Sequence, residues 1–175
     1  MSFSAQVKEE LCRTPLSRRC CARAEAYGIL LFCHSFTAAE IKIVTSAPVF
    51  AKRLPALFRK AFKVDFDRTP EPAETGKRIF LIMDPGKLAA IREAYGSDPA
   101  VSLANHINFA VLEEDHDRAA FLRGAFLAGG SVNDPTKSYH LELVTSHYSV
   151  SRELAALLPE AGFEPKQTTR KSNYV

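Results

Sequence analysis

The stretch of sequence that decides the fold is AFLRGAFLAGGSV, at residues 120–132. Small residues occur at every fourth position, at Ala120, Gly124 and Ala128. Because an α-helix has about 3.6 residues per turn, this spacing places all three on one stripe of a single helix. A stripe without large side chains predicts close contact between this helix and another element.

An earlier segment, at residues 24–36, has the same pattern with Ala24 and Gly28. A glycine inside a helix costs about 1 kcal/mol relative to alanine, and close approach of two backbones is one way to offset that cost. Since both helices share the feature, we predict that they pack against each other. The alternative is that each glycine only fits against the sheet of its own half.

The sequence that follows each glycine helix also repeats. The tripeptide Val-Thr-Ser at 44–46 recurs at 144–146, and each copy ends a β-like run of alternating apolar residues. A helical pattern follows each copy, over residues 47–62 and 147–161. A helix, a strand and a helix in the same order indicate an internal duplication.

The remaining elements are predicted from local pattern. Ser4 caps a short N-terminal helix that ends at Cys12, and Asp84 caps a helix over 85–95 with Pro85 at its first position. Further strands are predicted at residues 64–67 and 78–83, which would form a hairpin, and at 163–170 and 173–175.

This order predicts an α+β fold with pseudo-twofold symmetry. Two αββαββα-type repeats would each contain an antiparallel sheet backed by helices. Alternation along the strands predicts that Lys42 and Glu142 lie on open sheet faces, which are available to solvent or to a partner. The opposite, buried faces would carry Ile41, Ile43, Leu141 and Leu143.

Composition is that of a globular domain, with 175 residues of which 46% are hydrophobic. The longest apolar stretch, at 26–36, is too short for a membrane span, and we expect no signal peptide. The four cysteines have no C-x-x-C spacing, which indicates reduced thiols in a cytoplasmic protein. Basic residues predominate in the first third of the chain and acidic residues in the middle.

The glycine helix at 122–132 resembles the signature helix of the LAGLIDADG homing endonucleases, and residues 26–36 resemble a weaker copy. The whole chain resembles the N-terminal part of the WhiA family of bacterial regulators of sporulation and cell division. The motifs that carry this second resemblance are MSFS at 1–4, VKEEL at 7–11, CC at 20–21, AE at 24–25, FLRGAF at 121–126, GGSV at 129–132, DP at 134–135 and YHLE at 139–142.

The resemblance implies a division of the chain. Residues 1–22 would form an N-terminal helix and lead-in, 23–95 the first LAGLIDADG-like repeat, 96–118 a linker, and 119–175 the second repeat. The family's next domain is a helix-turn-helix DNA-binding domain, which this chain does not contain. The last predicted hairpin is also unfinished at Val175, so we expect the chain to be part of a longer protein.

The resemblance also implies where a nuclease would hold its metal. LAGLIDADG nucleases use one acidic residue at the end of each signature helix, and those positions are Cys33 and Gly129 here. Cysteine is a poor ligand for Mg²⁺ and glycine has no side chain. We therefore predict a degenerate, non-catalytic scaffold without catalytic residues, metal or cofactor. The acidic run at 113–117 is interpreted as a solvated helix start, with Asp115 or Asp117 as cap.

Basic side chains are the candidates for DNA contact. We selected four on predicted sheet faces and two before the first glycine helix: Lys42, Lys63, Lys166, Arg170, Arg18 and Arg19. The basic residues of the helix at 47–62 would face away from DNA and be solvated. Acidic residues share the sheet faces, so DNA binding by this chain alone should be weak.

The sequence and the resemblance are compatible with three functions. The first is a non-catalytic domain of a DNA-binding transcriptional regulator, located in the cytoplasm at the nucleoid, with double-stranded DNA as main partner through the helix-turn-helix domain. The second is a platform that binds a protein or ligand on the open sheet face. The third, an active nuclease, would need acidic residues at positions 33 and 129.

Overall fold

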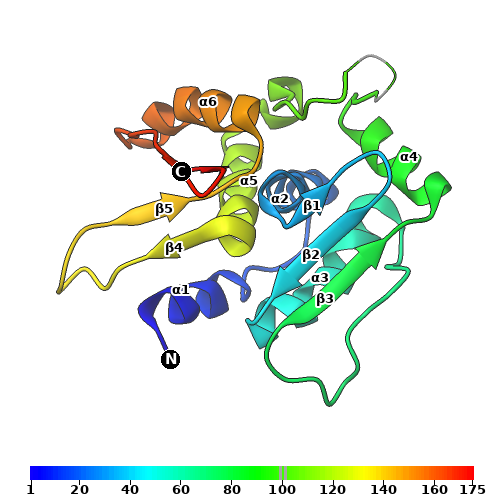
Figure 1. Cartoon of the computed structure of the whole chain (residues 1–175), viewed down its shortest axis with the longest axis horizontal. Helices are drawn as coiled ribbons and strands as arrows, with labels where there is room; N and C mark the ends of the chain where they lie inside the picture. The colour runs from blue at the N-terminus through cyan, green and yellow to red at the C-terminus, as the bar shows by residue number, and fades with distance from the viewer. Residues whose placement is uncertain (99, 101) are drawn as a thin grey trace.

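The computed structural model describes residues 1–98, 100 and 102–175. Two helices, α2 (Arg19–Phe32) and α5 (Asp115–Gly129), lie at its centre (Figure 1). They make the most extensive contact between any two described elements. Their N-termini adjoin, because Cys20 lies 3.8 Å from His116, and Gly129 at the end of α5 lies against Phe32 at the end of α2. The two helices therefore run side by side in the same direction.

The first repeat continues from α2 into a three-stranded antiparallel sheet with the order β1-β2-β3. Its strands are β1 (Ser35–Phe36), β2 (Ile41–Thr45) and β3 (Arg78–Ile82), and its helices are α3 (Pro48–Phe62) and α4 (Pro85–Ala94). Ile41 and Ile43 are fully buried, as predicted, together with Phe80 and Ile82 on β3. Helix α3 covers this apolar face, and the other face stays open (Figure 1).

The second repeat begins in the same helix-strand-strand-helix order, but its sheets are smaller, and two short strands follow its second helix in place of a strand and a helix. Its elements are β4 (Gly130–Val132), β5 (Leu141–Leu143), α6 (Tyr148–Leu157), the 3₁₀ turn η2 (Leu158–Ala161), β6 (Thr169–Arg170) and β7 (Asn173–Tyr174). Strands β4 and β5 form one antiparallel ribbon, and β6 and β7 form another. Thr145 and Tyr174 exchange two backbone hydrogen bonds, which join the second ribbon to the end of β5.

The repeated Val-Thr-Ser motif has the same local function in both halves. The Thr45 hydroxyl accepts a hydrogen bond from Ala47 N at 3.0 Å, and the Thr145 hydroxyl accepts one from His147 N at 3.2 Å. A threonine oxygen that binds the backbone two residues later turns the chain from the strand into the next helix. The duplication is therefore visible in hydrogen bonding as well as in element order.

Two shorter helices complete the described fold. Helix α1 (Phe3–Leu11) packs beside β4, and the 3₁₀ turn η1 (Phe109–Leu112) precedes α5. Ser2, not Ser4, caps α1 by accepting from Ala5 N. The Ser4 hydroxyl instead donates to Val132 O and accepts from Val132 N, at 2.8 and 2.7 Å. The Ser4 hydroxyl therefore makes a long-range contact that the local sequence does not predict.

Asp84 caps α4, as predicted.

Three strand predictions need correction. Residues 64–67 form no regular strand, although their alternation does bury Val64 and Phe66; only Arg68 pairs with β3, in a bridge to Leu81. Residues 163–168 are also irregular. Leu141, predicted to be buried, is 49% exposed because it lies in the last pair of the short β4–β5 ribbon, which extends beyond the helices (Figure 1).

The mixture of helices with small antiparallel sheets confirms the predicted α+β class. Among the described residues, no helix has the length and apolarity needed to cross a membrane. The division into repeats and linker stays a prediction, and the linker at 96–118 includes residues 99 and 101, which lie outside the described part of the chain.

Candidate functional site

The seam between α2 and α5 is built on two glycines. A Cβ added to Gly124 would lie 1.9 Å from Glu25 O, and one added to Gly28 would lie 2.1 Å from Phe121 O. Both neighbours are backbone atoms, which cannot rotate away as side chains can. The absence of a side chain at Gly28 and Gly124 therefore allows the two helix backbones to come into direct contact.

The other small residues of the predicted stripe also lie along these two helices. Ala24 and Ala120 are almost completely buried, at 0% and 1% exposure. Ala128, one turn after Gly124, is half-buried and packs against the core. Tyr27 next to the seam stacks on Tyr95 with ring centroids 4.0 Å apart and meets Phe121 edge-on. Aromatic rings thus fill the space beside the glycine contact.

A buried ion-pair cluster, which the sequence analysis missed, also crosses the seam. Glu25 on α2 is completely buried and accepts from Arg53 on α3 at 2.8 and 3.0 Å and from Arg123 on α5. Arg53 also donates to Cys12 O and Thr14 O, at 3.0 and 2.7 Å. Bidentate geometry and additional acceptors are what a buried charge needs.

Arg53 therefore corrects the expectation that the basic residues of α3 are all solvated. Its neighbours Lys52, Arg59 and Lys60 are exposed, whereas Arg53 is only 8% exposed. The sequence did contain a signal: Arg53 occupies the same helical stripe as Phe50, Leu54 and Leu57, which are all buried. A charged residue on an apolar stripe indicates a buried partner of opposite charge.

The positions where a nuclease would need acids lie at the C-terminal ends of the two helices. Cys33 is buried, and its thiol donates to Leu30 O and Ser35 O, both at 3.3 Å. Burial raises the pKa of the Cys33 thiol to about 12, so it stays protonated. A Cβ on Gly129 would lie 2.5 Å from Val144 O. No side chain fits at Gly129 in this backbone arrangement, so an acid there would require a local shift.

The open face of the first sheet carries a row of side chains that alternate in chemistry. Strand pairing places Ser35 opposite Lys42, Lys42 opposite Leu81, and Leu81 opposite Arg68. Directly paired residues point to the same side of a sheet, so Lys42 and Arg68 flank Leu81 on the open face. Arg68 was not among the predicted DNA contacts because the sequence placed it in a turn.

The other predicted DNA contacts are scattered. Lys63 does not face a sheet: it ends α3 in a left-handed conformation, with φ of 57°. Lys166 is exposed in the irregular segment before β6. Arg170 on β6 donates to Glu142 on β5 at 2.7 Å. Hydrogen bonds from His140 and then from Arg170 hold the pKa of Glu142 below its ordinary value. The Arg170 charge is therefore partly neutralised within the protein.

The last two candidates, Arg18 and Arg19, are exposed at the N-terminus of α2. They are at the opposite end of that helix from Cys33 and from the sheet that follows it. The structure thus does not gather the six predicted DNA contacts on one surface. It does bring together Cys20, Cys21, His116 and Asp117, which the sequence analysis treated as unrelated.

Comparison with known proteins supports the fold and the family. The model of the WhiA LAGLIDADG-like domain matches residues 118–175. Over the whole chain, identity is 33% to the probable cell division protein WhiA of Ruminiclostridium cellulolyticum and 31% to that of Alkaliphilus oremlandii. The chain spans 58% and 59% of the length of these two relatives.

Solved structures of the family have the same fold. Full-length DUF199/WhiA from Thermatoga maritima aligns with a TM-score of 0.72 and 18% identity, over 99% of this chain and 56% of that one. The N-terminal LAGLIDADG domain of DUF199/WhiA aligns with a TM-score of 0.67 and 20% identity, over 99% of this chain and 83% of that one. Residues 118–175 thus match the WhiA LAGLIDADG-like domain, and the whole chain is similar in sequence to WhiA proteins and in fold to the N-terminal LAGLIDADG domain of DUF199/WhiA.

Proposed function

We propose that this chain is a non-catalytic LAGLIDADG-like domain of a bacterial DNA-binding transcriptional regulator that acts in sporulation and cell division, in the cytoplasm at the nucleoid. The observation that carries the proposal is the contrast along the two central helices. Their seam keeps the close glycine contact, whereas their C-terminal ends carry a protonated Cys33 thiol and a Gly129 without space for a side chain.

This contrast argues against nuclease activity. Phosphodiester cleavage by the LAGLIDADG mechanism, as the resemblance implies, needs one acidic oxygen ligand from each helix end. Neither Cys33 nor Gly129 supplies one. A scaffold with this seam is suited to hold two sheets in a fixed relation without cutting DNA.

The first test is an assay for cleavage. Purified protein should leave supercoiled plasmid intact in Mg²⁺ and in Mn²⁺, at any salt concentration. Metal-dependent nicking that resists exhaustive repurification would contradict the proposal. Loss of such nicking on substitution of an acidic residue would then identify the ligand.

DNA contact by this domain should be weak and mainly electrostatic. The candidate face has Lys42 and Arg68 on the first sheet, and the second sheet offers an Arg170 already paired with Glu142. Non-specific binding to duplex DNA has a Kd of about 10⁻⁴–10⁻⁶ M at physiological salt, and we expect this chain to bind in or above that range. The helix-turn-helix domain that the resemblance implies would supply most of the affinity and the sequence selectivity.

Salt titration tests this assignment. If Lys42 and Arg68 touch phosphates, replacing both with alanine should reduce the slope of log K against log salt by about 0.9 per contact. The matched control is the pair Lys52→Ala and Lys60→Ala, on the helix that covers the opposite face of the first sheet, which should leave the slope unchanged. Equal effects of the two pairs would mean that the open face is not where DNA binds.

A second function is favoured by one observation. The open face of the first sheet also exposes the apolar side chain of Ile79, at 39%, and the end of the β4–β5 ribbon exposes Leu141, at 49%. Such surface is typical of protein contact sites. If the chain does not bind DNA even at low salt, a platform for a protein or ligand becomes the better assignment.

A further inference from the structure

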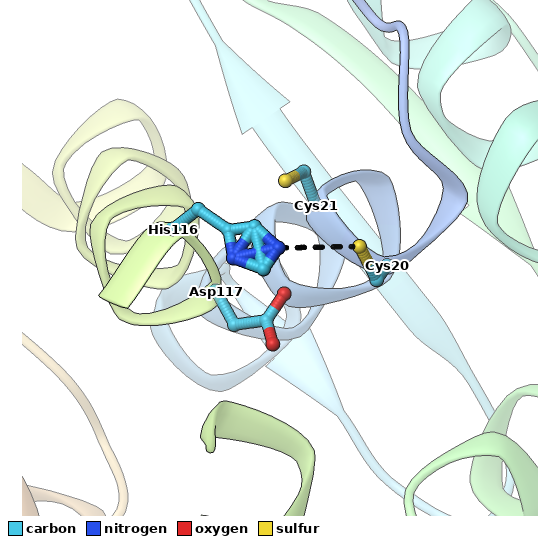
Figure 2. Close-up of side chains that lie close together, drawn as sticks. All are labelled: Cys20, Cys21, His116 and Asp117. Carbon is cyan, nitrogen blue, oxygen red and sulfur yellow. Dashed lines mark hydrogen bonds between the residues drawn. The ribbon is translucent and has the colours of Figure 1, made fainter. Parts of the chain in front are cut away.

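Four side chains with metal-binding chemistry meet where the N-termini of α2 and α5 adjoin. Cys20 and Cys21 come from α2, and His116 and Asp117 come from α5 (Figure 2). Each offers one ligand atom, and the four atoms all lie within 4.8 Å of one another. Cys20 Sγ is 3.8 Å from His116 Nε2. Figure 2 shows His116 pointing from α5 toward Cys20 on α2, with the side chains of Cys21 and Asp117 on the two sides of the imidazole ring.

A buried carboxylate oxygen points independently to a ligand at this place. Asp117 is 7% exposed, and its Oδ1 atom has no hydrogen-bond partner in the described structure. An unpaired buried carboxylate oxygen is costly, and native proteins rarely leave one without a partner, a water molecule or an ion. The interpretation of Asp117 as a solvated helix cap is therefore wrong, because the packing of α5 against α2 turns it inward.

The four groups match the ligand preferences of one metal. Zn²⁺ takes cysteine thiolate, histidine nitrogen and carboxylate oxygen in tetrahedral sites. Bond lengths of about 2.0–2.3 Å place such ligand atoms roughly 3.3–3.8 Å apart, so small rotations of these side chains would bring all four into range. Two thiolates also disfavour Mg²⁺ and Ca²⁺, which prefer oxygen ligands.

Burial, and then the neighbouring Cys20 and Asp117, raise the pKa of the Cys21 thiol above its ordinary value, and Arg18 only partly opposes this shift. A metal that binds here must therefore displace the thiol proton, and its affinity should increase with pH. Cys20 is exposed, while Cys21 and His116 are half-buried, so an ion can enter from solvent.

We propose that Cys20, Cys21, His116 and Asp117 bind a structural zinc ion that links the two repeats at the N-terminal ends of their central helices. This site is distinct from the positions at Cys33 and Gly129, which lie at the other ends. The sequence alone predicts no metal, because the four ligands do not lie within one motif. Here each half supplies two adjacent ligands, 96 residues apart, and only the helix seam unites them.

Cobalt substitution tests the proposal directly. The untagged protein, stripped of metal and kept reduced, is titrated with Co²⁺. One equivalent should produce the sulfur-to-cobalt charge-transfer band and the intense visible bands of tetrahedral coordination, and Zn²⁺ should then displace them. Zinc at a hundred times its Kd should raise the midpoint of thermal unfolding by about 5–10 °C for a protein of this size.

Matched variants locate the site. Cys20→Ser and His116→Gln should each weaken zinc binding by at least about tenfold, because each removes a coordinating atom. Cys12→Ser and His34→Gln replace a cysteine and a histidine outside the cluster and should bind as the parent does. Cys20 is exposed, so its variant should fold normally, which circular dichroism will verify.

Two results would overturn the proposal. One is the absence of cobalt bands and of a zinc-dependent thermal shift in the reduced parent protein. The other is binding that survives in the Cys20→Ser, His116→Gln double variant with unchanged stoichiometry and affinity, which would mean that metal binds elsewhere on the chain.

Discussion

The two repeats both begin with a helix, two strands and a second helix, but the second strand and the second helix are longer and better buried in the first repeat than in the second. In the first, five-residue strands β2 and β3 pair along their whole length, and the 15-residue helix α3 covers them. In the second, β4 and β5 pair over three residues, and α6 has ten. Tyr139 and Leu141 are 93% and 49% exposed there, whereas Ile41 and Ile43 are at most 1% exposed.

The difference shows that a repeat can have a small sheet when its central helix packs into the core of the other repeat. Helix α5 contributes Ala120, Phe121 and Ala125 to the same core that α2 and α3 form. The second half thus depends on the seam for burial more than on its own sheet. Substitutions should therefore have unequal effects at matched positions, and the following four measurements examine this in order of expected effect.

The largest loss should come from the seam itself. Gly124→Ala places a Cβ 1.9 Å from Glu25 O, so the helices must separate or the backbone must shift. We expect a loss of about 3 kcal/mol or more in the free energy of unfolding, measured by urea denaturation. Gly86→Ala in α4 is the control, because its Cβ would meet only the end of the Asp84 side chain. Similar stability of the two variants would show that the seam is looser than described.

Matched leucines test the two cores. Leu54 in α3 and Leu154 in α6 are 0% and 5% exposed. Leu54→Ala should cost about 2–5 kcal/mol, and Leu154→Ala should fall near the lower end of that range, because thinner packing can collapse around the cavity. Denaturant unfolding of both variants measures the difference. A larger loss at Leu154 would reverse our view of which half is better packed.

Matched threonines test the repeated motif. Thr145 is 3% exposed, and its hydroxyl also donates to Leu31 O at 2.7 Å, whereas Thr45 only accepts from Ala47 N. Thr145→Val leaves a buried carbonyl unpaired and should cost about 1–3 kcal/mol. Thr45→Val should cost about 0.5–1 kcal/mol, because water can replace the lost contact. Thermal unfolding compares them, and equal costs would argue against the special role of Thr145.

The smallest effect should be a dependence of stability on pH below 6.5 that His147 in the second repeat causes. Burial, and then the positive charge of Arg92, lower the pKa of His147 below its ordinary value of 6.5. The unfolded chain then binds more protons, so stability should fall as the pH drops below 6.5 toward the lower folded pKa. The matched residue in the first repeat is Ala47. His147→Ala should therefore flatten the stability curve below pH 6.5, and an unchanged curve would exclude His147 as the cause.

Local pattern was sufficient for much of this fold. The spacing of Gly28 and Gly124 predicted two helices in close contact, and the repeated Val-Thr-Ser located both strand-to-helix turns. Periodicity predicts which face of an element is buried, because burial follows from the geometry of that element alone. The prediction of burial from periodicity was wrong at Leu141. There the position of the residue at the end of a short ribbon, rather than the alternation of the strand, determines the exposure of the side chain.

Most of the chemistry of the site could not be predicted in the same way. Glu25 and Arg123 are 98 residues apart in the sequence. Their contact therefore cannot be predicted from any local stretch of sequence. The cluster of Cys20 with His116 has the same origin, since its members share no motif. Arg53 is the exception, because its position on an apolar stripe could have indicated its burial.

The buried Glu25 cluster has a consequence for how the domain folds. A carboxylate in the interior is tolerable only when its guanidinium partners are in place, and those partners come from opposite halves: Arg53 on α3 and Arg123 on α5. If only one half were folded, Glu25 would lack one of its two arginine partners, and the glycine face of the central helix would be exposed to solvent. The two halves should therefore fold and unfold in a single cooperative step, although the sequence repeat divides the chain into two units.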